Sequence, residues 1–218
     1  MTPDFWRQRW QNGEIGWHSE EINRHLTEHW PRLRPRPGSR VLVPLCGKTR
    51  DLLWLAAQGH RVLGVEISPL AIDQFIAENG LIAVRRDEPA FQRVSVDEIE
   101  LLVGDFFDLT AAHLDGVSAV YDRASLIALP PAMRPGYAAR LTDLLPSDAL
   151  SLLITLDYDQ RQMSGPPFAV SEAEVLELFA GTFDVTPLAA VEVLAEHPRF
   201  RARGLDHLTE QVYRLRRR

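Results

Sequence analysis

The sequence predicts an α/β protein built on a doubly wound, mostly parallel sheet. The main observation is the stretch Arg40–Ile67, which has the order strand, glycine turn, helix, strand. Residues 41–43 form a short apolar run of the kind found in a sheet that is covered on both faces. Further strand candidates at 117–121 and 149–156, with a helix candidate at 131–145 between them, continue the alternation that parallel sheets require.

A turn with a single glycine joins the first strand to the first helix. The turn spans residues 45–48, and the following segment, 51–58, has apolar residues at helical spacing. Gly59 stands where a helix commonly takes a left-handed terminating residue. The second strand candidate, 61–65, is followed directly by Glu66.

Glu66 is the first candidate binding residue. Parallel sheets bind ligands outside the carboxyl ends of their strands, and nucleotide-binding folds place an acid about 20 residues after the glycine turn. A carboxylate can accept hydrogen bonds from both hydroxyls of a ribose, so adenosine is a natural partner for Glu66. An ordinary exposed glutamate at a strand end is the alternative, and this stretch alone leaves both open.

The same turn is a poor phosphate site. A dinucleotide site needs three glycines in the pattern G-x-G-x-x-G, and this loop contains only Gly47. Gly47-Lys48-Thr49 resembles the end of a P-loop, but the earlier glycine that a P-loop requires is replaced by Leu42. A nucleoside without phosphates, such as S-adenosylmethionine, therefore fits better.

Composition limits the class of protein. A chain of 218 residues with 45% hydrophobic content can bury one sizeable core, so we expect a single domain over 1–218. No apolar run approaches the length of about 18 residues that a membrane helix needs. The net charge of −6 argues against a nucleic-acid groove. The single cysteine cannot form an internal disulfide, which favours the reducing cytoplasm.

The first 38 residues are expected to cover the ligand crevice. Trp6 and Trp10 are four residues apart, so on a helix they share one face. An amphipathic helix packed on the sheet is the simpler interpretation. The sharper hypothesis is that Trp6, Trp10 and Trp17 lie over a cationic ligand such as a sulfonium, which an indole face attracts by about 0.5–2 kcal/mol. Residues 31–38, with three prolines, are predicted to be a stiff connector.

Two later strand ends also carry candidate site residues. Asp105 and Phe106 follow the third strand, expected within 91–103, and suit an acid that accepts from the adenine amino group and a ring that covers the base. A turn with an Asx bond is the alternative there. Asp122 and Arg123 end the fourth strand and should lie at the crevice, although a surface ion pair is the commoner use of such a dipeptide.

The remainder of the chain gives mostly structural predictions. Ser68 and Pro69 begin a helix that should end near Asn79. Residues 157–168 have no periodicity and form a candidate lid or substrate wall. Ser171 and Glu174 predict a capping box. Two strand candidates and a solvated arginine tail complete the chain: 185–194, 208–215 and 216–218.

Several spaced motifs together resemble the thiopurine S-methyltransferase family, including its bacterial members. They are W-R-Q-R-W-Q-N-G-E-I-G-W from Trp6, P-L-C-G-K from Pro44, G-H-x-V-x-G-V-E-I-S from Gly59, Y-D-R-A-S-L from Tyr121 and G-P-P-F from Gly165. The resemblance implies a class I, Rossmann-like methyltransferase that uses S-adenosylmethionine, with seven strands and the last one antiparallel. It also implies that the acceptors are aromatic or heteroaromatic thiols such as thiopurines, and extends to selenium or tellurium compounds.

The resemblance also assigns site residues. Those implied to line the cofactor pocket are Trp10, Leu45, Glu66 and Arg123, with Asp105 and Phe106 holding the adenine. Trp17 is implied to contact the acceptor, and it stands where animal members have phenylalanine. No metal is implied.

Methyl transfer from a sulfonium to a thiol is an in-line displacement, in which alignment and desolvation supply much of the acceleration. Aromatic thiols are largely ionised near neutral pH, so no general base is required, and Arg123 is the candidate for stabilising the thiolate. Two alternatives remain at this stage: a methyltransferase for small anions such as halide or thiocyanate, and a P-loop nucleotide hydrolase or kinase.

Overall fold

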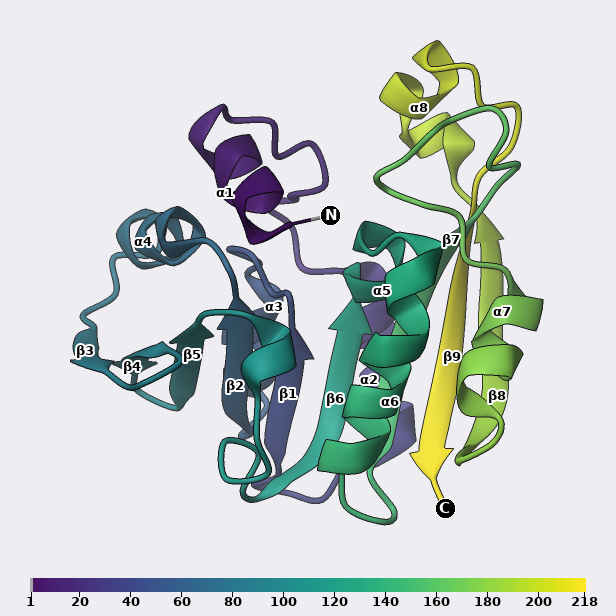
Figure 1. The fold of residues 1–218 in the computed structure, drawn as a ribbon. Helices are drawn as coiled ribbons and strands as arrows, with labels where there is room; N and C mark the ends of the chain where they lie inside the picture. The colour runs from purple at the N-terminus through teal and green to yellow at the C-terminus, as the bar shows by residue number, and fades with distance from the viewer. Residues whose placement is uncertain (1) are drawn as a thin grey trace. The chain divides into compact units, whose positions relative to one another are not determined.

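The computed structural model describes residues 2–218, which divide into two compact units (Figure 1). The first unit ends at Tyr121 and the second spans Asp122–Arg218. The described residues contain nine strands rather than the seven that the resemblance implies. No helix within residues 2–218 combines the length and the apolar composition that crossing a bilayer would require.

The first unit is built on parallel strands with an antiparallel extension. Its strands lie in the order β3-β4-β5-β2-β1-β6, where β1 is parallel to both β2 and β6, and β2 is parallel to β5. The strands are β1 (Arg40–Pro44), β2 (Arg61–Glu66), β3 (Val84–Asp87), β4 (Gln92–Val96), β5 (Ile99–Val103) and β6 (Val117–Arg123), whose last two residues begin the second unit. The helices are α1 (Pro3–Gln11), α2 (Arg24–Leu33), α3 (Asp51–Ala57), α4 (Pro69–Glu78) and the 3₁₀ turn η1 (Phe106–Asp108).

Strand register brings the predicted turns to one edge of this sheet. Pro44 is paired with Val65, so the turn after β1 lies beside the end of β2. Glu66 is paired with Val103, so the residues that follow β5 lie beside Glu66. The predicted strand–turn–helix–strand order is confirmed, and Gly59 has the expected left-handed backbone (φ 84°). The capped helix is confirmed as α4, whose Ser68 Oγ accepts from the Ala71 N–H at 3.4 Å.

The third strand expected within 91–103 is confirmed as β5, which is parallel to β2 and ends at Val103. Its approach is a further strand, β4, antiparallel to β5 and paired with β3, because Asp97 takes a left-handed conformation (φ 47°) that reverses the chain. The connector expected at 31–38 is helical at its start, with Pro31 inside α2. Helix α2 forms because Leu26, Trp30 and Leu33 recur at helical spacing and are all buried.

The second unit contains an antiparallel group of strands in the order β7-β9-β8. The strands are β7 (Leu150–Asp157), β8 (Phe183–Glu192) and β9 (Thr209–Arg217). The helices are α5 (Ser125–Ala128), α6 (Arg134–Leu144), α7 (Glu172–Phe179) and α8 (Pro198–Ala202), with 3₁₀ turns η2 (Pro131–Met133) and η3 (Leu194–Glu196). The final strand is antiparallel to both of its neighbours, as expected.

The arginines at the chain end are part of the fold rather than a solvated tail. Strand β9 continues to Arg217, whose guanidinium donates to the Leu145 carbonyl oxygen. Arg216 pairs with Asp148 at 2.6 Å. The prediction of a solvated tail is wrong because each of these side chains has a partner in the same unit.

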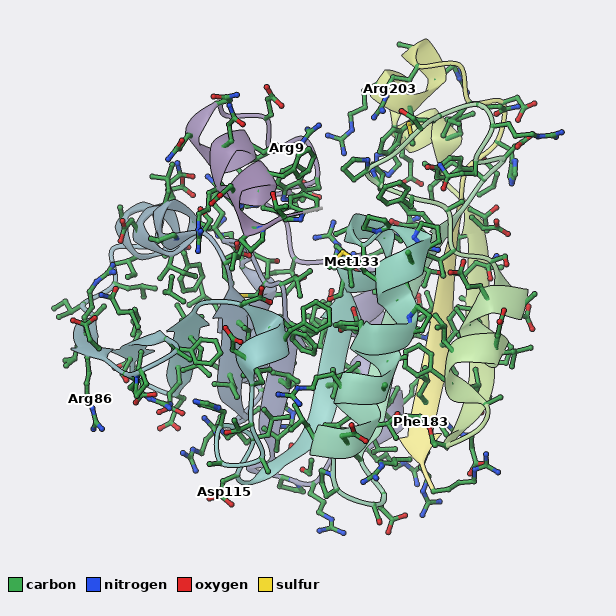
Figure 2. All side chains as sticks on the ribbon, in the orientation of Figure 1. Arg9, Arg86, Asp115, Met133, Phe183 and Arg203 are labelled. Carbon is green, nitrogen blue, oxygen red and sulfur yellow. The ribbon has the colours of Figure 1, made fainter. Side chains whose placement is uncertain are left out.

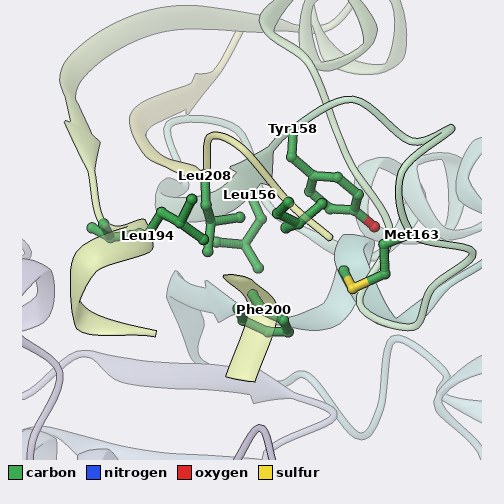
Figure 3. Close-up of a cluster of buried hydrophobic side chains, with 8 residues drawn as sticks. Leu156, Tyr158, Met163, Leu194, Phe200 and Leu208 are labelled. Atoms are coloured by element: carbon green, nitrogen blue, oxygen red, sulfur yellow. The ribbon is translucent and has the colours of Figure 1, made fainter. Parts of the chain in front are cut away.

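Residues 157–168 are tied down by their own polar side chains. Tyr158 Oη donates to the Pro167 carbonyl oxygen at 2.6 Å, and Gln160 Oε1 accepts from the Ala169 N–H at 2.9 Å. Tyr158 and Met163 also belong to a buried apolar cluster of the second unit (Figure 3). The other buried members of that cluster are Leu156, Val193, Leu194, Phe200, Leu205 and Leu208. The segment that lacks periodicity is therefore ordered, and its role as a lid or substrate wall stays a prediction.

Candidate active site

The turn after β1 bends sharply through two left-handed residues, Leu45 (φ 48°) and Gly47 (φ 56°). Glycine takes this conformation without strain, whereas a leucine in it costs of order 1 kcal/mol. A Cβ on Gly47 would lie 3.2 Å from the Trp10 Cζ2 atom. The missing side chain at position 47 therefore lets the Trp10 indole pack directly against the backbone of the turn.

Glu66 ties this turn to the start of α4. Its side chain is buried, and its two carboxylate oxygens accept separate backbone hydrogen bonds, Oε2 from the Gly47 N–H and Oε1 from the Ser68 N–H, both at 2.8 Å. The alternative of an exposed strand-end glutamate is wrong. A carboxylate has about four acceptor sites, which is more than the backbone N–H groups of Gly47, Ile67 and Ser68 occupy. Glu66 can therefore shape the edge of the sheet and still accept hydrogen bonds from a ligand.

Burial raises the pKa of Glu66 to about 7, because desolvation outweighs the stabilising backbone N–H bonds from Ser68, Gly47 and Ile67. The carboxyl group is thus poised between its acid and its carboxylate near neutral pH. A ligand that donates hydroxyl groups to Glu66 would favour the carboxylate.

The aromatic residues of the N-terminal segment gather at this edge. The Trp17 ring makes edge-to-face contacts with Trp6 and Trp10, with centroid separations of 5.5 Å and 6.1 Å. Arg7 Nε donates to the Ile67 carbonyl oxygen at 3.4 Å, which holds α1 beside the end of β2. Figure 2 labels Arg9 on the same helix; its guanidinium lies over the Phe5 ring at 4.8 Å. That the three indoles cover a ligand stays a prediction.

The residues after β5 join the same edge. The Gly104 N–H donates to the Glu66 carbonyl oxygen at 2.9 Å. Asp105 Oδ1 accepts from the Phe107 N–H at 2.9 Å, so the Asx turn that was the alternative is present. A carboxylate has further acceptor capacity, which keeps a role at adenine open for Asp105. The Phe106 ring is largely buried, 4% exposed, and its contact with a base stays a prediction.

Cys46 and Lys48 have structural roles in the turn. The Cys46 sulfur lies 2.9 Å from the position that a Cβ on Gly64 would take, and burial raises the pKa of the thiol well above its usual value. Lys48 Nζ is paired with Glu78 at 2.6 Å. Because the Gly47 N–H and the Lys48 ammonium are both engaged within the fold, this turn does not have the free donors of a P-loop.

Arg123, in the second unit, is the last residue of β6 and precedes a strained turn. Ala124 has a left-handed backbone (φ 85°), which is uncommon for a residue with a side chain. Asp122 is buried and accepts from Tyr137 Oη at 2.7 Å and from Ser125. Burial raises the pKa of Asp122 to about 6. Asp122 is therefore a buried support of the turn, and the alternative of a surface Asp-Arg pair is wrong.

Two arginines that sequence reasoning missed share the electrostatic environment of Arg123. The pKa of Arg199 is lowered by burial and then by the nearby positive charges of Arg203 and Arg123. Figure 2 labels Arg203, which follows α8. The available signal was the arginine-rich sequence P-R-F-R-A-R from Pro198. The charges of Arg123 and Arg203 therefore lie near enough to act on the Arg199 guanidinium.

The predicted site residues thus fall into two groups. The turn at Leu45, the buried Glu66, the three indoles and the Asp105-Phe106 pair are brought to one edge of the first unit. Arg123 belongs to the second unit, with Arg199 and Arg203. No group of three or more histidine, cysteine, aspartate or glutamate side chains suited to a metal ion occurs within the described part of the chain.

The fold is that of the class I, S-adenosylmethionine-dependent methyltransferases. A solved structure with this fold is 1,6-didemethyltoxoflavin-N1-methyltransferase from Burkholderia thailandensis, with bound 1,6-didemethyltoxoflavin and S-adenosylhomocysteine. It matches with a TM-score of 0.63 and 21% identity, over 99% of this chain and 86% of that chain. At that identity the likeness shows the fold.

The chain belongs to the thiopurine S-methyltransferase family, whose model matches residues 1–218. It is 50% identical over 215 residues to a thiopurine S-methyltransferase of Nitrosospira multiformis, covering 99% of this chain and 98% of the relative. It is 51% identical over 217 residues to that of Pseudomonas paraeruginosa, covering 100% of both chains. The P-loop alternative has no support in these relatives.

Proposed function

We propose that this protein transfers a methyl group from S-adenosylmethionine to the sulfur of an aromatic or heteroaromatic thiol, with residues 1–218 acting as one methyltransferase domain. Family membership over the whole chain supports the reaction class. The structural observation that carries the proposal is the buried Glu66 carboxylate, which accepts backbone hydrogen bonds beside a glycine turn and keeps acceptor capacity for a ligand.

The edge of the first unit supplies groups that suit the cofactor. Glu66 accepts hydrogen bonds from the ribose hydroxyls, and the turn at Leu45 brings the backbone close to the ligand. Trp10 and Trp6 present indole faces to the sulfonium, which such faces attract by about 0.5–2 kcal/mol. The bound cofactor supplies an electrophilic methyl group on positive sulfur. Asp105 accepts from the adenine amino group and Phe106 packs on the base.

The acceptor is recognised as an anion. Arg123 stabilises the thiolate by a charge-assisted hydrogen bond, directly or through water, and contacts the cofactor as well. The neighbouring Arg199 adds to the positive field that Arg123 provides. Trp17 contacts the acceptor ring. Because aromatic thiols are substantially ionised near neutral pH, proton abstraction by the protein is not needed.

Calorimetry and an acceptor panel test this proposal. S-adenosylhomocysteine should bind the wild-type protein with a stoichiometry of one and bind Glu66→Ala much more weakly. The panel should include a thiophenol, a thiopurine, a selenol, a tellurium compound, thiocyanate and iodide, with methylated product measured by mass spectrometry. Turnover of the aromatic thiols is expected. The proposal would be overturned if S-adenosylhomocysteine did not bind the wild-type protein. It would also be overturned if thiocyanate and iodide were the only acceptors that are methylated.

A further inference from the structure

The side chain of Arg134 is buried under the turn that carries Arg123. Arg134 is the first residue of α6 and is 1% exposed. Its Nε donates to the carbonyl oxygens of Leu126 and Leu129, at 3.1 Å and 3.0 Å. Leu126 is the second residue of α5, which begins two residues after Arg123, and Leu129 is its C-cap. One guanidinium therefore holds the short helix that follows Arg123.

The same guanidinium reaches the wall formed by residues 157–168. Its Cζ lies 5.9 Å from the centroid of the Phe168 ring, and the Phe168 N–H donates to the Ile127 carbonyl oxygen at 2.7 Å. Arg134 Nη1 is held in turn by both carboxylate oxygens of Glu174, at 2.6 Å and 2.7 Å. Glu174 was predicted to complete a capping box with Ser171; Ser171 does cap α7, but the Glu174 carboxylate binds Arg134 instead.

The turn depends on such support. Helix α5 has four residues, which is too short to be stable through its own hydrogen bonds. It also follows Ala124, whose left-handed backbone is strained. Packing and hydrogen bonds from elsewhere must therefore fix its position. The two carbonyl contacts from Arg134 supply this fixation.

Stability alone is a weak reason for this arrangement. Burying an ion pair costs desolvation, and apolar residues of similar volume often serve a core as well or better. Arg134 Nη2 is also buried without a hydrogen-bond partner among residues 2–218, which adds to the cost. An apolar pair could not replace the hydrogen bonds that Arg134 donates to the Leu126 and Leu129 carbonyl oxygens.

We infer that Arg134, oriented by Glu174, is a positioning residue for the methyl acceptor. It fixes the turn that carries Arg123 and the wall that ends at Phe168 in one geometry, so that the acceptor thiolate meets both. The inference rests on the proposed function, in which Arg123 contacts the acceptor. It assigns Arg134 no contact with the acceptor or the cofactor.

The decisive variant replaces the ion pair by apolar side chains of similar length, Arg134→Met with Glu174→Met. We expect this double variant to fold with a thermal midpoint close to that of the wild type, because the lost hydrogen bonds to the two carbonyls oppose the relief of ion-pair desolvation. We expect the KM for an aromatic thiol to rise at least fivefold, while the Kd for S-adenosylhomocysteine stays within twofold. The matched control is Arg216→Met with Asp148→Met, which removes an exposed pair of the same unit and should change neither constant.

A purely structural role predicts a different result. Partial unfolding would lower kcat per total enzyme and leave the KM of the folded fraction unchanged, and that outcome in the double variant would overturn the inference. If the double variant does not fold, Glu174→Gln is decisive instead, because it keeps one acceptor oxygen for Arg134. It should raise the acceptor KM by a smaller factor, and an unchanged KM there would equally overturn the inference.

The proposed function is tested separately by the wild-type protein. If the wild type methylates no aromatic thiol, the proposed function fails before any variant is compared. If the wild type does so and the variants keep its KM, the positioning role alone fails.

Discussion

Each unit of the molecule buries a charged side chain beside a strand-end turn, and the two differ in how that charge is compensated. Among residues 2–218 no cation pairs with Glu66, whose oxygens are satisfied by the backbone N–H groups of Gly47 and Ser68. Arg134 in the second unit is compensated by the carboxylate of Glu174. An uncompensated buried acid remains ready to titrate and to accept ligand donors, whereas a paired guanidinium is committed to the protein.

This difference indicates that Glu66 is expected to bind the ligand, whereas Arg134 is expected to position other residues. Glu66 accepts only backbone hydrogen bonds within the described residues, and its carboxylate keeps acceptor capacity that a ligand can use. The guanidinium of Arg134 donates its hydrogen bonds to the carbonyl oxygens of Leu126 and Leu129 and to the carboxylate of Glu174. Changing Glu66 should therefore alter cofactor affinity, and changing residues near Arg134 should alter acceptor kinetics.

The largest effect is expected from Glu66→Ala. Loss of two charge-assisted hydrogen bonds to ribose, each contributing about 1.5 kcal/mol, should weaken S-adenosylhomocysteine binding about 100-fold. Calorimetry measures it. Glu88→Ala is the matched control, because Glu88 is a partly buried acid of the same unit that pairs with Arg93 at 2.7 Å. A Kd for Glu66→Ala within threefold of wild type would contradict the role of Glu66.

The next largest effect is expected from Arg123. Arg123 is proposed to contact the acceptor, whereas Arg134 is proposed only to position it. Arg123→Ala should lower kcat/KM for an aromatic thiol about 30-fold, the equivalent of one lost charge-assisted hydrogen bond of about 2 kcal/mol. Steady-state kinetics under saturating cofactor gives the number, with Arg216→Ala as the exposed control. Unchanged kcat/KM in Arg123→Ala would show that the thiolate is stabilised elsewhere.

The uncompensated charge of Glu66 also predicts a pH dependence. Its folded pKa of about 7 lies above the ordinary value of 4.5, so the folded protein retains a proton that the unfolded chain releases between these values. Its contribution to stability is therefore greatest at low pH and falls as the pH rises to 7.

Cofactor binding should have the opposite dependence, because ribose hydroxyls favour the carboxylate of Glu66. The affinity for S-adenosylhomocysteine should increase about tenfold from pH 6 to pH 8 and level off above that. Calorimetry in buffers of different ionisation enthalpy would show proton release on binding near pH 6.5. Glu66→Gln should bind more weakly and without this slope, and a wild-type affinity that is flat across the range would refute the linkage.

The smallest effect tests the strain beside Arg123. Ala124→Gly should stabilise the protein by up to about 1 kcal/mol, because glycine accepts a left-handed backbone without strain. Ala128→Gly, at the end of α5, should destabilise by about 0.5–1 kcal/mol. Urea denaturation compares the two variants. If both variants changed the free energy of unfolding in the same direction, the backbone at Ala124 would not be strained.

Much of the first unit could be predicted because its signals are local. The apolar run of β1, the turn at Gly47 and the cap at Ser68 are short-range patterns that fix backbone conformation within a few residues. The hairpin before β5 and the helix through Pro31 were missed for the opposite reason. Both depend on which side chains find a buried face, and that choice is made by tertiary packing.

By itself, the sequence determined the parallel βαβ core, the place of Glu66 at the end of the second strand and the family to which the motifs belong. Tertiary structure alone decided that the Glu66 carboxylate is buried against two turns, that Asp122 supports its own turn from inside, and that Glu174 binds Arg134. The physical reason is that periodicity and spacing encode local conformation and exposure. The partner, and hence the charge state, of a buried group is set by residues distant in the chain.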